Sequence, residues 1–138
     1  MSGPALRQLH SHRAIHEGGL SGAVMKTEDL IGYLQQGEVE MVNQACDHLL
    51  DYWKTRVISH ADAEEEGFYK QVLEENPELE REIIQLTRDH DLLRLLVSDI
   101  EAARKKDLNV TAEIMQKFHA LLVVNELHSR EEERLLFQ

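Results

Sequence analysis

One short pattern occurs twice in this chain of 138 residues, once near the middle and once at the C-terminal end. The first copy begins at His60 and the second at His128, and in each a glutamate follows four positions later, at Glu64 and Glu132. Residues four apart on an α-helix lie about one turn apart on the same face. Each copy therefore predicts an imidazole beside a carboxylate on one face of a helix.

Apolar residues recur with a seven-residue spacing along four stretches, which predicts four long helices with apolar seams. The most regular seam runs from Leu79 to Ile100 and the weakest from Ala5 to Ala23. Each seam is interrupted by polar residues. In chain order these are His12 and His16, then His60 and Glu64, then His90, and then His128 and Glu132.

Turn signals separate the four helices. Gly37 follows the first, Asn76 and Pro77 place a cap residue and a first-turn proline between the second and third, and residues 107–111 precede the fourth. Short connections between long helices favour antiparallel neighbours. We expect an all-α fold, an antiparallel up-down-up-down four-helix bundle that forms a single domain over residues 1–138.

The first helix is expected to be kinked or broken in two. Four of the seven glycines fall within it, at Gly18, Gly19, Gly22 and Gly32, and glycine disfavours helix interiors. Residues 27–29, Thr-Glu-Asp, also resemble a new N-cap with an acidic first turn.

The polar residues of the four seams are predicted to meet in one layer. In antiparallel neighbours, residues equally far from a connecting turn lie at equal depth. The midpoint of His60 and Glu64 lies 14 residues before Asn76, and His90 lies 14 after it. His90 and His128 are each 19 residues from Asn109. Counted back through Gly37, the first helix reaches the same level at position 12, close to His12 and His16.

Such a layer favours a metal site. A lone histidine on an apolar face is usually a hydrogen-bonded core residue, but imidazoles and two carboxylates together would be costly to bury without a cation. Imidazole and carboxylate ligands suit Fe, Mn or Zn, and two carboxylates placed to bridge make two metal ions plausible. The remaining histidines, His10, His48 and His119, are expected at the surface, and Cys46 is expected to be a small buried hydrophobe.

Composition excludes several other classes. The net charge of −11 without a basic stripe argues against nucleic-acid binding, and the longest apolar run, residues 120–124, is too short for a membrane span. No secretory signal precedes the first helix, and a single cysteine allows no internal disulfide, so a cytoplasmic location is expected. No nucleophile–base pair, phosphate loop or HExxH motif supports a hydrolase or a nucleotide-binding protein.

The sequence resembles the hemerythrin-like (HHE cation-binding) family from Leu6 to Phe137, through the order H…HxxxE…H…HxxxE. The resemblance implies a left-handed four-helix bundle around a non-haem di-iron centre. It implies as ligands His12, with or without His16, His60, Glu64, His90, His128 and Glu132, with both glutamates bridging. The third helix offers His90 alone, since Leu86 and Arg94 occupy the neighbouring turns. Water or a tyrosine such as Tyr33 is the alternative to His16.

The resemblance also implies a small ligand, such as O2, NO or H2O2, bound beside the metals. We expect Trp53, Val57, Leu93 and Val97 to line its pocket. The leading hypothesis is a protein that binds or senses O2 or reactive oxygen and nitrogen species. Alternatives are iron storage or delivery, iron–sulfur repair, a scavenging enzyme for peroxide or nitric oxide, and a metal-free structural bundle. A regulatory role would require a separate protein partner.

Overall fold

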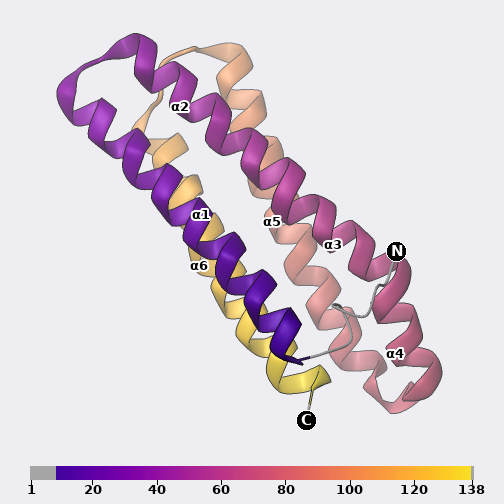
Figure 1. Cartoon of the computed structure of the whole chain (residues 1–138). Coiled ribbons are helices and arrows are strands. Elements are labelled where there is room, and N and C mark those ends of the chain that lie inside the picture. The colour runs from indigo at the N-terminus through magenta and orange to yellow at the C-terminus, as the bar shows by residue number, and fades with distance from the viewer. Residues whose placement is uncertain (1–8, 138) are drawn as a thin grey trace.

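A computed structural model describes residues 9–137 of the chain, and these residues form helices joined by short connections (Figure 1). In chain order the elements are α1 (Leu9–Gln36), α2 (Val39–Tyr52), η2 (Trp53–Ile58), α3 (Ser59–Ala63), η3 (Glu64–Phe68), α4 (Tyr69–Glu75), η4 (Pro77–Leu79), α5 (Glu80–Lys106) and α6 (Ala112–Leu136).

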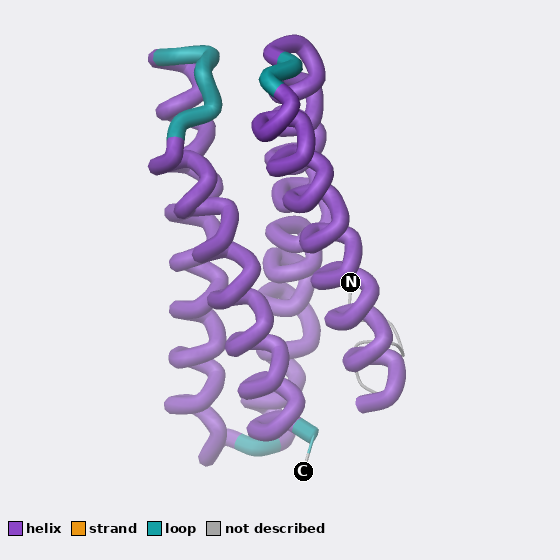
Figure 2. The backbone as a smooth tube through the Cα atoms, turned by 90° about the vertical axis from the view of Figure 1, so that its left-hand side faces the viewer, coloured by secondary structure: helices purple, strands orange, loops and turns teal. Residues whose placement is uncertain are grey.

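The described residues form four rods, which are α1, the elements from α2 to α4, α5 and α6. Neighbouring rods run antiparallel, as can be followed in Figures 1 and 2. The elements from α2 to α4 form the second rod, because the residues that join them keep right-handed helical backbone angles. α1 packs against α2 and α6, and α5 packs against α6. Residues 9–137 contain no strand. The predicted all-α four-helix bundle is confirmed, and none of its described helices is long and apolar enough to cross a membrane.

The three connections lie where the turn signals predict them. Gly37 adopts a positive φ of 70°, and the amides of Gly37 and Glu38 bond back to the carbonyls of Leu34 and Tyr33, at 3.2 Å each. This is the Schellman arrangement that ends many helices, and it favours glycine because a side chain is strained at that φ.

The other two connections differ in how they are capped. Thr111 caps α6, since its hydroxyl accepts a hydrogen bond from the amide of Ile114 at 3.2 Å. Pro77 begins a short 3-10 turn as predicted, but the side chain of Asn76 makes no capping hydrogen bond. The chain there is held instead by the amide of Leu79, which donates to the carbonyl of Asn76 at 3.0 Å.

The expected break in α1 is wrong, because the helix is continuous from Leu9 to Gln36. Thr27 does not start a new helix. Its buried hydroxyl donates to the carbonyl of Ala23 one turn earlier, at 2.7 Å, so it is satisfied inside the helix. Gly22 serves close packing rather than bending, since a Cβ at this position would overlap the ring of Tyr52.

Two π-helical turns, η2 and η3, interrupt the second rod on either side of His60. A π-turn closes its hydrogen bonds over five residues instead of four, and such turns are frequent at functional sites. The buried face therefore moves forward along the sequence. Gly67, seven residues after His60, is only half-buried, whereas Phe68 and Tyr69 are the buried residues there.

Two apolar clusters fill the bundle, one toward each end. The larger contains Trp53, Phe118 and Cys46, whose thiol is fully buried as expected. The smaller contains Phe68 and Tyr69 and is covered by the last residues of α6. The polar residues of the four seams belong to neither cluster and occupy the level of the bundle between them.

Candidate metal centre

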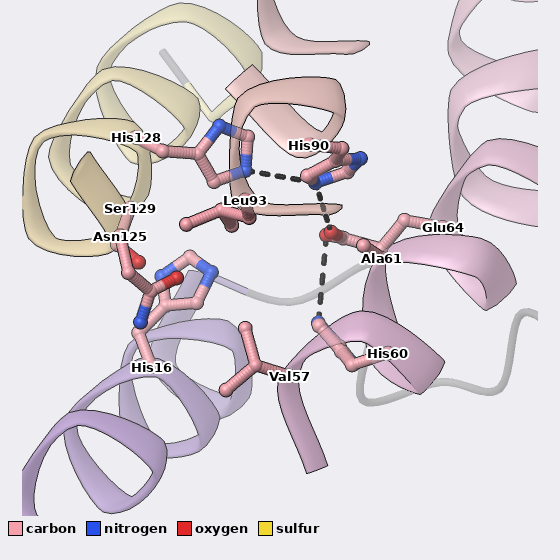
Figure 3. Close-up of a pocket in the computed structure, with 10 residues that line it drawn as sticks. All are labelled: His16, Val57, His60, Ala61, Glu64, His90, Leu93, Asn125, His128 and Ser129. Atoms are coloured by element: carbon pink, nitrogen blue, oxygen red, sulfur yellow. Dashed lines mark hydrogen bonds and ion pairs between the residues drawn. The ribbon is translucent and has the colours of Figure 1, made fainter. Parts of the chain in front are cut away.

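Seven buried or half-buried side chains from all four rods converge on the polar level of the bundle. They form two groups of four, and within each group the potential ligand atoms lie within 4.8 Å of one another. The first group is His12, His16, His60 and Glu64, and the second is Glu64, His90, His128 and Glu132. Figure 3 shows five of these side chains pointing toward one another. The residues selected from the sequence therefore meet at one depth.

Both glutamates lie between the two groups. Glu64 has one carboxylate oxygen 3.2 Å from Nε2 of His12 and the other 3.3 Å from Nε2 of His90. Glu132 contacts Nε2 of His12 through Oε1, while its Oε2 lies 3.4 Å from Nε2 of His128. Each carboxylate thus presents one oxygen to each group, which is the placement needed to bridge two cations.

Three of the imidazoles are oriented by carboxylates behind them. Nδ1 of His16 lies 2.7 Å from Glu133, Nδ1 of His90 lies 2.7 Å from Glu65, and Nδ1 of His128 lies 2.9 Å from Asp89. A carboxylate accepts a hydrogen bond from a protonated Nδ1, which leaves Nε2 free to act as a ligand. Metal-binding histidines are commonly oriented in this way.

The buried charges of the site depend on one another. Burial by itself would raise the pKa of Glu132, but hydrogen bonds with His12, His128 and His16 hold it well below its ordinary value. Burial would lower the pKa of His12, yet Glu132 and Glu64 raise it to about 9. In the same way Asp89 and Glu132 outweigh burial and raise the pKa of His128 to about 10. The site is therefore built for positive charge, which protons supply when no metal is bound.

Three further observations indicate that the donor atoms suit a metal ion. Nε2 of His90 faces Nε2 of His128 at 3.0 Å, and when both Nδ1 atoms donate outward these two nitrogens are both acceptors. A proton or a cation must then lie between them. In addition, Nε2 of His60 is buried without a hydrogen-bond partner among the described residues, and the nearest carboxylate oxygen, Oε2 of Glu64, lies 3.6 Å away. The donors are all nitrogen and oxygen, since Cys46 lies in the apolar cluster away from the site.

A comparison with family models identifies the family of the chain. The model described as the hemerythrin HHE cation binding domain covers residues 7–138. The chain belongs to the hemerythrin HHE cation-binding family. The comparisons with curated proteins and with solved structures gave no match.

In this hemerythrin-family domain a small cavity of about 20 Å³ adjoins the donor atoms. It is lined by His16, Val57, His60, Ala61, Glu64, His90, Leu93, Asn125, His128 and Ser129 (Figure 3). Val57 and Leu93 thus line it as the sequence suggests. Trp53 and Val97 are not among its lining residues, although both belong, like Leu93, to the larger apolar cluster. Asn125 and Ser129, which the sequence pattern does not single out, give the cavity two uncharged polar groups.

The sequence pattern also does not reveal Tyr69 or the carboxylates that lie behind the imidazoles, which are Glu65, Asp89 and Glu133. Tyr69 donates its hydroxyl to Oε2 of Glu132 and stacks on the ring of His90 at 5.5 Å, with burial and the charge of Glu132 raising its pKa well above the ordinary value. The π-turn η3 delivers this residue, and a seven-residue pattern cannot show it. Glu133 lies in an acidic run, Glu131 to Glu133, which is typical of a solvated helix face, but it is only 6% exposed.

The structure places His16 and Tyr33, the tyrosine considered as an alternative ligand, in different parts of the bundle. His16 lies in the site, with Nε2 3.1 Å from Glu132, whereas Tyr33 packs at the edge of the larger apolar cluster. The three other histidines, His10, His48 and His119, are exposed, as the sequence predicts.

Proposed function

We propose that this hemerythrin-family domain is a non-haem di-iron protein that binds or senses O2 or reactive oxygen and nitrogen species. The observation that carries the proposal is the pair of donor groups joined by Glu64 and Glu132. Their oxygens face both groups, so two cations held there would share both carboxylates. Iron is the metal we favour, with manganese or zinc as the alternatives, because imidazole and carboxylate suit all three.

The two groups are not equivalent. The first has three imidazoles, from His12, His16 and His60, besides the shared carboxylates, whereas the second has two, from His90 and His128. A metal in the second group would therefore keep more coordination positions open. The small cavity is lined by histidines of both groups, and the second group faces it through His90 and His128. We infer that a ligand of two or three heavy atoms binds on this side.

Iron in such a centre would supply the electrons and the open coordination position that diatomic and peroxide ligands require. The residues of the chain would set the surroundings. Val57 and Leu93 would exclude water, and Asn125 and Ser129 would offer polar contacts to a bound ligand. Tyr69 would keep its own proton and donate a hydrogen bond to Glu132. A dry lining of this kind protects reactive species from side reactions.

The proposal is tested by metal analysis and absorption spectroscopy of protein loaded with iron under aerobic conditions. We expect about two irons per chain, as the two donor groups require, and near-ultraviolet bands that change when azide, peroxide or nitric oxide is added. Glu64→Ala should abolish this signature, and His119→Ala, which removes an exposed histidine, should keep it. Wild-type protein that retains no metal after loading would refute the proposal.

The same preparation separates the alternative functions. Iron that a mild chelator removes quickly would support storage or delivery in place of ligand sensing. Catalysed loss of peroxide or nitric oxide, well above the rate with free iron, would support a scavenging enzyme. Stable iron that binds these ligands reversibly, without turnover, is the result expected for binding or sensing.

A further inference from the structure

A second cavity of about 30 Å³ adjoins the first on the side of α1 and η2. The two share four lining residues, His16, Val57, His60 and Asn125. The second cavity is completed by Ile15, Gly19 and Arg56. In Figure 3 the side chain of Val57 lies between His16 on α1 and His60 on α3. The two adjoining cavities, which together extend from the donor atoms toward the exposed Arg56, are called the passage below.

Gly19 leaves the passage open. Although Gly19 is buried, a Cβ built on it would meet no atom within 4 Å, so its missing side chain corresponds to empty space. The backbone of α1 is fixed at this point, because the hydroxyl of Tyr52 donates to the carbonyl of Gly19 at 2.9 Å. A side chain at position 19 would therefore project into the passage without moving the helix.

Arg56 marks the outer end of the passage. Its side chain is exposed, and its guanidinium reaches over α1, since a Cβ on Gly18 would lie 3.4 Å from it. Within residues 9–137 no carboxylate lies in ion-pair distance of Arg56, unlike Arg13 and Arg94, which pair with glutamates. In a chain of net charge −11, this unpaired cation provides a local attraction for anions.

We propose that the ligand reaches the metal centre through this passage between α1 and η2, and that the passage selects small anions. Each cavity has room for about one water molecule. The passage therefore admits linear or diatomic species of two or three heavy atoms and excludes larger oxidants such as alkyl hydroperoxides. Arg56 favours anions, among them azide and the deprotonated forms of small oxygen and nitrogen species. This inference rests on the proposed function, because it concerns access to the same centre.

Gly19→Val tests the route, with Gly32→Val as the matched control. Gly32 also lies in α1 with no atom within 4 Å of its built Cβ, but it is remote from the cavities, so both variants carry the same helix cost. In iron-loaded protein, stopped-flow mixing with azide should show association slowed about ten-fold or more by Gly19→Val, since entry then needs a conformational change. Dissociation should slow by the same factor, leaving Kd unchanged. Gly32→Val should match the wild type.

A second readout does not depend on iron chemistry. In manganese-loaded protein, oxygen-17 relaxation measures how fast metal-bound water exchanges with solvent, and Gly19→Val should slow that exchange. If Gly19→Val fails to fold, Gly19→Ala should give a smaller slowing in both measurements. Azide association and water exchange at wild-type rates in a folded, fully metal-loaded valine or alanine variant would overturn the route.

Arg56→Gln tests the preference for anions. Azide association should slow by about two- to five-fold and lose part of its salt dependence, because a charge at a rim acts mainly on association rate. The association rate of nitric oxide, which is neutral, should be unchanged. An equal decrease in association rate for both ligands, or no decrease for either, would overturn the anion preference. Failure of the proposed function is distinguished from both results, since it appears as wild-type protein that retains no metal.

Discussion

Glu133 is one of the carboxylates that orient the imidazoles of the site, and Glu133→Gln isolates its contribution to metal affinity. Oε2 of Glu133 lies 2.7 Å from Nδ1 of His16 and 3.0 Å from Arg130, and Oε1 lies 3.2 Å from Arg13. Glutamine has nearly the same shape and still offers an oxygen to the imidazole, but it carries no charge. The substitution therefore removes the electrostatic support for His16 while keeping its orientation.

The surroundings of Glu133 set the size of the expected loss of metal affinity. Replacing a partner behind a metal-bound histidine typically lowers metal affinity by about ten- to one-hundred-fold. The lower figure applies here, because glutamine keeps one hydrogen bond and Arg13 and Arg130 already neutralise part of the charge. We predict a loss of about ten-fold, or about 1.4 kcal/mol. Asp89→Asn should cost less than Glu133→Gln, because the side chain of Asp89 is 32% exposed and that of Glu133 is 5% exposed.

Affinity is measured by competition with a chelator for ferrous ion under anaerobic conditions. Glu131→Gln is the matched control, since Glu131 is a neighbour in sequence, is exposed, and pairs with Arg134 rather than with the site. Thermal unfolding of the metal-free variants shows whether the bundle itself has changed. Unchanged affinity in Glu133→Gln would refute the reasoning, and so would an equal loss in Glu131→Gln.

Three further predictions concern the bundle itself. Gly22→Ala should unfold with a free energy about 1–3 kcal/mol below that of Gly32→Ala, because only the first creates an overlap, with Tyr52; equal denaturation midpoints would contradict this. Thr111→Ala should cost about 1 kcal/mol through loss of the α6 cap, measured by urea unfolding, and Thr111→Asp should restore it. Cys46, whose pKa is raised by burial, should react with a thiol reagent at pH 8 only after unfolding, and rapid labelling of the native protein would show that its cluster opens.

The fold was predictable because its signals are local and repeated. Apolar residues at helical spacing define the buried face of α5, from Ile83 to Ile100, and Gly37 and Thr111 mark helix ends with familiar capping chemistry. The depth of the metal site was predictable for a related reason. Helices rise by a constant amount per residue, so counting from Asn76 and Asn109 brings His90 level with its neighbours.

Features that depend on three-dimensional packing were not predictable. The glycines of α1 suggested a break, because nothing in the sequence shows that Tyr52 packs over Gly22. The π-turns place Tyr69 and Phe68 inside, and a regular repeat cannot reveal an inserted residue. Glu133 follows Glu132 directly, and its inward position becomes clear only once His16 is seen beside it.

Anomalous diffraction at the iron edge, from crystals of the iron-loaded protein, tests the central claim most directly. The account predicts two peaks at the polar level of the bundle, one beside His12, His16 and His60 and one beside His90 and His128. Carboxylate density from Glu64 and Glu132 should join the two peaks. A single peak, or iron bound only at surface carboxylates while these imidazoles bond to one another, would contradict it.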